Sequence, residues 1–192
     1  MAKIRMYNFV TTDGFYAGLN DEIDWFEEER IEIDGKEELD HQRPESPRTM
    51  IFGRKTYEMM REYFSSEQAL QDDPRTTRRM REDAKIVFSK TLEGTGEGPT
   101  WKDATLLRSF DPEYFKSLKK DTSQDMVILG SGPIVRQFFD AGLLDELELM
   151  VIPVNLGQGK PLLSPEEISN LALTETRKYQ NGIVSRTYSV DV

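Results

Sequence analysis

Three short, mostly apolar runs constrain the fold of this chain more than any other feature of its sequence. They lie in "TMIFG", "AKIVFS" and "MVILG", and each run ends at a glycine or a serine. An apolar run of this length, bounded by turn-forming residues, is typical of a strand that is buried on both faces. Helical patterns follow the first and third runs, so the sequence predicts an α/β fold with parallel strands covered by helices.

Other segments supply the remaining strands. Residues 3–11 show a two-residue alternation, and residues 104–107 and 144–152 also have the pattern of strands. Near the C-terminus, Gln180-Asn181-Gly182 joins two alternating segments, and Asn-Gly is the strongest short-range signal for a β-hairpin. We therefore predict a single domain over residues 1–192, with a mostly parallel central sheet, helices on both faces and an antiparallel hairpin at the C-terminal edge.

Helices are expected in several places between these strands. Asp111 is suited to cap a helix that continues to about Lys120, and the helix after Pro133 should end near Gly142. A further helix is expected from Asp21 onward, with Phe26 facing inward. The charged segment 31–48 is predicted to be a poorly patterned connection or a short helical insertion, and the segment 65–83 to be a helix or an ordered loop on the surface.

Composition excludes several classes of chemistry. The chain has 35 acidic and 25 basic residues and a formal charge of -10, which disfavours binding to nucleic acid or to an anionic membrane. It has no cysteine and one histidine, His41, so thiolate chemistry, histidine triads and metal sites are not expected. No window has the pattern of a leader or of a membrane span, and we expect a cytoplasmic protein.

Small and basic residues gather where strands pass into helices or loops. Because ligands collect at the carboxyl ends of parallel strands, three such corners are candidate anion sites. Each corner has a second interpretation as ordinary packing, since helix starts, serines and glycines are common at turns. The corners are Gly53-Arg54-Lys55-Thr56, Ser89-Lys90 and Gly130-Ser131-Gly132.

Carboxylates for acid–base chemistry are expected between the first strand and the first helix. The candidates are Asp13, Glu22 and Asp24, and partial burial there would keep a carboxyl pKa close to neutrality, as a proton donor requires. The alternative is that these charges interact with a helix dipole. Trp25 and Phe26 are candidates for an aromatic wall against a planar heterocycle, or for core packing.

Several ordered motifs resemble the dihydrofolate-reductase-like superfamily, and within it the branch of the C-terminal reductase domain of the riboflavin-biosynthesis deaminase-reductase. They are "NFVTTDGFYAG", "MIFGRKTYE", "KIVFSKTLE" and "VILGSGPIVRQFFDAGLLDELELMVIPVNLGQGKPLL". The resemblance covers nearly the whole chain except residues 31–48 and 65–83. It implies a three-layer fold of this type and NADPH as the cofactor.

The resemblance also implies roles for residues. The corner Gly53 to Thr56 matches the segment that meets cofactor phosphates, and Ser89 with Lys90 matches the segment near the adenosine 2′-phosphate. Gly130, Ser131, Gly132 and Ile134 match the loop and helix start under the pyrophosphate and nicotinamide ribose. Glu22 falls at the place of the single acid of true dihydrofolate reductases, although the usual Trp-Asn-Leu-Pro approach is missing.

The expected function is an NADPH-dependent reductase of a small heterocycle, like 5-amino-6-(5-phosphoribosylamino)uracil reductase or dihydrofolate reductase. The alternative is a non-catalytic NADP(H)-binding or interaction module on the same fold. A homodimer is expected as well, because the C-terminal hairpin and residues 147–152 offer surfaces for a two-fold contact, and two-fold dimers are the commonest oligomers.

Overall fold

The computed structural model describes residues 1–25, 48–96, 98, 101–102 and 104–190. The chain divides into two compact units, Met1–Arg5 with Ser46–Leu143 and Met6–Glu45 with Leu144–Val192. Most of the helix expected from Asp21 onward, with Phe26, and the segment 31–48 with His41 lie outside or largely outside the described residues.

A parallel four-stranded sheet forms the centre of the first unit, and its strand order is β5-β4-β3-β6. The strands are β3 (Thr49–Gly53), β4 (Ala84–Phe88), β5 (Ala104–Leu107) and β6 (Met126–Leu129). Ile51 pairs with Ile86 on one side and with Ile128 on the other, and these side chains are almost fully buried. The apolar runs therefore form buried parallel strands, as the sequence predicts.

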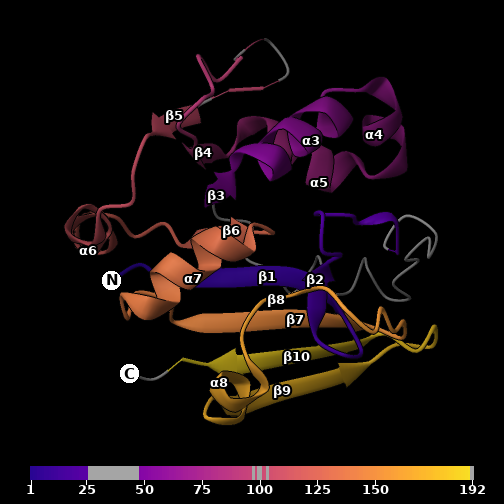
Figure 1. Cartoon of the computed structure of the whole chain (residues 1–192). Coiled ribbons are helices and arrows are strands. Elements are labelled where there is room, and N and C mark those ends of the chain that lie inside the picture. The colour runs from indigo at the N-terminus through magenta and orange to yellow at the C-terminus, as the bar shows by residue number, and fades with distance from the viewer. Residues whose placement is uncertain (26–47, 97, 99–100, 103, 191–192) are drawn as a thin grey trace. The chain divides into compact units, whose positions relative to one another are not determined.

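Five helices of the first unit follow these strands or connect them (Figure 1). They are α3 (Arg54–Phe64), α4 (Glu67–Asp72), α5 (Pro74–Glu82), α6 (Pro112–Asp121) and α7 (Gly132–Asp140). The segment 65–83 forms two helices, and Asp73 ends α4 and caps α5 by accepting from the N–H of Thr76. The Thr77 hydroxyl is buried and donates to the Ala69 carbonyl, which fastens α5 to α4.

Phenylalanines pack α6 and α7 within the core of the first unit. The rings of Phe115 and Phe138 lie 4.7 Å apart, and both side chains are fully buried. Phe88 at the end of β4 and Phe110 before α6 complete this cluster. Aromatic pairs at such distances add to the stabilisation from burial alone.

The second unit is built on the antiparallel strands β7, β10 and β9, which lie side by side in Figure 1. Its elements are β1 (Ile4–Thr11), which begins in the first unit, β2 (Phe15–Ala17), β7 (Glu146–Ile152), β8 (Lys160–Pro161), α8 (Pro165–Ser169), β9 (Ala172–Lys178) and β10 (Val184–Ser189). The predicted hairpin is confirmed, and Gly182 has the positive φ of +86° that its turn requires. Together with the parallel strands of the first unit, this hairpin gives the predicted fold class.

Candidate functional site

Two of the predicted corners meet at the carboxyl ends of neighbouring strands in the first unit. The strands β3 and β6 are paired in parallel, so both chain reversals occur at the same edge of the sheet. Helix α3 begins at Arg54 directly after β3, and α7 begins at Gly132 after the corner that follows β6. Two helix N-termini, each the positive end of a helix dipole, are thus placed side by side.

Ser131 links the two corners. Its Oγ accepts a hydrogen bond from the N–H of Gly53 at 2.8 Å and is bonded to the Thr56 hydroxyl at 3.0 Å. Ser131 is the N-cap residue of α7, but its side chain makes no capping bond and its φ is +59°. The hydroxyl is therefore used to join the two helix starts rather than to cap its own helix.

The glycines of these corners allow the close approach. A Cβ atom on Gly53 would lie 3.0 Å from the Ser131 Oγ, and one on Gly130 would lie 3.1 Å from the Thr56 Oγ1. Gly130 also has a φ of +59°, a conformation that favours glycine. The tight packing at these glycines brings the two helix starts to one place.

Cationic side chains border the junction. Arg54 and Lys55 are exposed on the first turn of α3, and Arg54 forms an ion pair with Glu58 at 3.5 Å. Gly132 and Ile134 are buried at the start of α7. The junction therefore combines helix dipoles, hydroxyl groups and positive charge, which is suited to an anionic ligand.

The third corner follows β4, the strand next to β3. The Ser89 hydroxyl accepts from the N–H groups of Thr91 at 3.2 Å and Leu92 at 2.9 Å, so it shapes the turn, while Lys90 is exposed. Arg108 donates to the carbonyls of Ser89 and Leu92. Sequence reasoning missed Arg108, although its place just after the strand 104–107 was a usable signal.

Asp13 organises the loops of the second unit. Its carboxylate accepts from the Thr11 hydroxyl, from the N–H of Gly157 at 2.7 Å and from the N–H of Leu156 at 3.4 Å. Desolvation raises the pKa of Asp13, but these hydrogen bonds outweigh it and leave the pKa below its ordinary value. The direction is opposite to the shift toward neutrality that we expected here, because the charged form is the hydrogen-bonded one.

Glu22 and Asp24 are exposed in the second unit. The Glu22 carboxylate accepts from the side-chain amide of Asn20 at 2.7 Å and from its N–H at 2.8 Å. These bonds lower the pKa of Glu22, again opposite to the expected direction. The Asp24 carboxylate accepts from the N–H of the next residue, Trp25, at 3.1 Å.

Trp25 is 6% exposed and packs in an apolar cluster with Met150, Ile152, Tyr179 and Ile183. Core packing, the second of our two interpretations, therefore describes its position. Phe26 lies outside the described residues.

A charged group that the sequence did not point to lies beside the strand pair β2 and β8. Lys160 forms an ion pair with Asp21 at 2.6 Å, and Asp21 holds a left-handed φ of +70°. The hydrogen bond to Asp21 raises the pKa of Lys160, while burial and then the charge of Asp21 raise the pKa of Tyr16. Sequence patterns gave no signal for this group, because Asp21 and Lys160 are 139 residues apart.

Within the described part of the chain, no helix is long and apolar enough to cross a membrane. The same residues contain no group of three or more histidine, cysteine, aspartate or glutamate side chains that is placed to hold a metal ion.

The fold of this chain is dihydrofolate-reductase-like. A putative riboflavin biosynthesis protein from Shewanella sp. PV-4 is similar at a TM-score of 0.66 and 21% identity, over 98% of each chain. Dihydrofolate reductase from Enterococcus faecalis, solved in complex with NADP(H) and RAB-propyl, is similar at a TM-score of 0.55 and 13% identity, over 97% of this chain and 95% of that one. A pyrimidine reductase-like protein from Corynebacterium diphtheriae is similar at a TM-score of 0.52 and 13% identity, over 100% of this chain and 92% of that one.

The chain belongs to the RibD C-terminal domain family, whose model matches residues 2–185. Two proteins of Bacillus subtilis (strain 168) are similar over nearly their whole length. The uncharacterized protein YyaP is 28% identical over 93% of this chain and 90% of its own, and the uncharacterized protein YwjB is 27% identical over 94% of each. The resemblance stated from the motifs is confirmed.

Proposed function

We propose that this protein is an NADPH-dependent reductase that transfers a hydride to a small heterocycle of the pyrimidine or pterin type. The model reactions are those of 5-amino-6-(5-phosphoribosylamino)uracil reductase in riboflavin biosynthesis and of dihydrofolate reductase. One observation carries the proposal, namely the junction where Ser131 joins the starts of α3 and α7. Family membership and the NADP(H) complex of the Enterococcus faecalis relative support the choice of cofactor.

The residues at the junction fit a dinucleotide with several phosphates. Gly53 and Gly130 leave room for the hydroxyl groups of Ser131 and Thr56, and Gly132 begins α7. Arg54 and Lys55 supply positive charge. We assign Thr56, Ser131 and Ile134 to the same cofactor-binding set, and Ser89 with Lys90 to a second phosphate. When bound, NADPH supplies the hydride, so the protein has to position the reactants and provide a proton.

The hydrogen bonds and pKa shifts of the candidate carboxylates constrain which residue can donate the proton. Asp13 is engaged by three hydrogen bonds, and Glu22 has a lowered pKa, so both are ionised at neutral pH in this state. We propose Glu22 or Asp24 as the proton donor, with Phe26 toward the substrate, while Trp25 belongs to the apolar core. Glu22 would then have to gain its proton when the substrate binds and water leaves.

The state of these carboxylates also favours one alternative function. A reductase fold whose candidate acids are ionised or engaged in loop structure is also suited to a non-catalytic module that binds NADP(H) or a partner. The two functions differ in turnover and agree in cofactor binding, so binding and turnover need separate measurements.

NADPH binding is the first test. A ligand at 100 times its Kd stabilises the folded state by about 2.7 kcal/mol, which corresponds to a rise in Tm of roughly 5–10 °C for a chain of this size. The variant Lys55→Glu should lose most of this rise. Lys116→Glu, the same charge change on the exposed face of α6, should keep it. No rise in Tm at millimolar NADPH would contradict both the reductase and a module that binds NADP(H).

Turnover is the second test, followed by the absorbance of NADPH with dihydrofolate and with 5-amino-6-(5-phosphoribosylamino)uracil. Oxidation of NADPH with either substrate supports the reductase, and Glu22→Gln and Asp24→Asn then identify the proton donor by the loss of turnover at unchanged NADPH affinity. Binding of NADPH without oxidation by either substrate supports the alternative module.

A further inference from the structure

Strand β9 has a free edge. It is the outer strand of the order β7-β10-β9, and none of the described strands pairs with its other side. Six of its seven residues are exposed, and Arg177 is half-buried. An exposed edge strand of this length is a template for pairing with another chain unless its side chains oppose it.

The hairpin register determines which backbone groups of β9 point outward. Tyr179 donates its N–H to the Ile183 carbonyl, so these two residues form a hydrogen-bonded pair next to the turn. Hydrogen-bonded and non-hydrogen-bonded pairs alternate along an antiparallel ladder. Lys178 opposite Val184 and Thr176 opposite Arg186 are therefore non-hydrogen-bonded pairs. The N–H and C=O groups of Lys178 and Thr176 consequently point away from β10.

The charges on β9 complement themselves about Thr176. Glu175 and Arg177 flank this residue, lie on the same face of the strand and form an ion pair at 3.2 Å. A two-fold axis through Thr176 would set Glu175 of each copy opposite Arg177 of the other. An axis through Glu175, Arg177 or Lys178 would instead set that residue's charge against the same charge of the second copy. Among the regularly paired residues of β9, Thr176 is therefore the only position for the axis that satisfies two conditions. Its N–H and C=O groups point outward, and the charges that face each other across the axis are opposite.

We propose that the occupant of this edge is a second copy of the chain, with β9 paired antiparallel to β9 of that copy about a two-fold axis at Thr176. The two Thr176 residues then exchange N–H to C=O hydrogen bonds, and each Glu175 lies in the closely spaced position opposite an Arg177. The register shift between Thr187 and Tyr188, where β9 carries an extra residue, limits this pairing at its N-terminal end. The proposal gives the expected homodimer a specific interface and does not depend on the reductase activity.

Charge reversal tests this register in solution by sedimentation velocity. Arg177→Glu and Glu175→Arg each set like charges opposite one another at two places, so each variant alone should dissociate. We expect its dimer Kd to rise roughly tenfold or more. An equimolar mixture of the two variants should dimerise again, because each cross-strand pair then joins a carboxylate to a guanidinium. Lys120→Glu, on α6, makes the same change in net charge as Arg177→Glu and should leave the dimer intact.

A backbone variant gives an independent test. Thr176→Pro removes the outward N–H without removing a bond to β10, so it should abolish the dimer while the melting temperature stays near that of the wild type. A wild-type chain that is monomeric at its highest soluble concentration would overturn the proposal. So would a wild-type dimer that all these variants retain, or single variants that dissociate but do not pair when mixed.

Discussion

Ser131 holds a backbone conformation that a serine adopts only at a cost. Its φ of +59° lies in the left-handed region, where a residue with a Cβ atom is disfavoured by about 1–2 kcal/mol. Its hydroxyl offsets this cost, because it satisfies the N–H of Gly53 and the hydroxyl of Thr56. The hydrogen bonds that join the two helix starts therefore compensate for the strained backbone of Ser131.

Two substitutions separate the strain from the link. Ser131→Gly removes the hydroxyl and the strain together, so its free energy of unfolding should stay within about 1 kcal/mol of the wild type. Ser131→Ala keeps the strain and loses the hydrogen bonds, so it should be less stable by roughly 1–3 kcal/mol. Both variants should also bind NADPH more weakly. Urea unfolding measures the free energies of unfolding, and titration with NADPH measures the affinities.

The matched control for these substitutions is Ser123→Ala, at an exposed position between α6 and β6. It should change neither the free energy of unfolding nor the affinity for NADPH. Wild-type NADPH affinity in both Ser131 variants would show that the link does not organise the cofactor site.

The lowered pKa of Asp13 predicts how the free energy of unfolding depends on pH. Its pKa is lowered in the folded chain, so its contribution to stability is fully present above the ordinary carboxyl pKa and is lost as the pH falls through the folded value. Asp13→Asn should therefore lower the free energy of unfolding at neutral pH by about 1 kcal/mol, with the difference vanishing in acid. Urea unfolding at a series of pH values measures this.

Asp121→Asn, the same change at an exposed residue of α6, is the control and should leave the free energy of unfolding at neutral pH near that of the wild type. If Asp13→Asn keeps its stability and its NADPH affinity but loses turnover, the residue acts on the substrate instead of on the loops.

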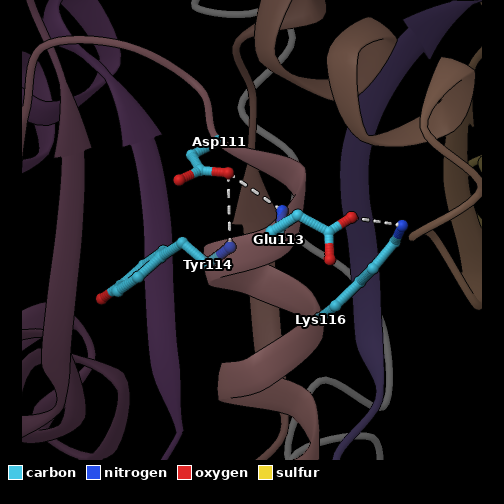
Figure 2. Close-up of polar contacts among 4 residues, drawn as sticks. All are labelled: Asp111, Glu113, Tyr114 and Lys116. Carbon is cyan, nitrogen blue, oxygen red and sulfur yellow. Dashed lines mark hydrogen bonds and ion pairs between the residues drawn. The ribbon is translucent and has the colours of Figure 1, made fainter.

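Among the elements, α6 shows most clearly how far local sequence determines a helix. Figure 2 shows the Asp111 carboxylate accepting from the N–H groups of Glu113 and Tyr114, at 3.0 and 3.4 Å. Pro112 occupies the first turn, and basic residues lie in the last turn. Every signal lies within one helical length, so the start at Asp111 was predictable from sequence.

Removal of this cap should destabilise the chain measurably. Asp111→Ala leaves two N–H groups of the first turn without their acceptor and should cost about 1 kcal/mol in urea unfolding. Lys116→Ala is the control, because the exposed pair between Lys116 and Glu113 in Figure 2 contributes only about 0.2–0.5 kcal/mol. An equal loss in both variants would mean that Asp111 is not the cap that sets this helix.

The charged segment 65–83 was less well predicted than α6. Its helices α4 and α5 are short, and they are held by the bond from the Thr77 hydroxyl to Ala69 and by Asp73, which serves both. Asp73-Pro74 matches the pattern of a helix start, which our prediction for this segment did not use. Short helices, however, depend on tertiary packing for most of their stability, so periodicity alone left a loop as an alternative.

Across the whole molecule, the formal charge of -10 and the proposed cofactor site act in opposite directions. A chain of this charge repels a phosphate compound at long range, and screening at physiological salt limits that repulsion to about 8 Å. Binding then depends on what lies within that distance. The exposed Arg54 and Lys55 and the two helix starts provide local attraction in the first unit.

The buried strands, the capped helix at Asp111 and the Asn-Gly hairpin were predictable from sequence, because each depends on residues that are close together in the chain. Residue type also identified the candidate corners. How those residues are used depends on contacts between distant parts of the chain. The Ser131 hydroxyl bonds Gly53, 78 residues away, and the Asp13 carboxylate bonds Gly157, 144 residues away. A residue type fixes how many hydrogen bonds a side chain can make, whereas the folded chain fixes which partners it reaches and which protonation state those partners favour.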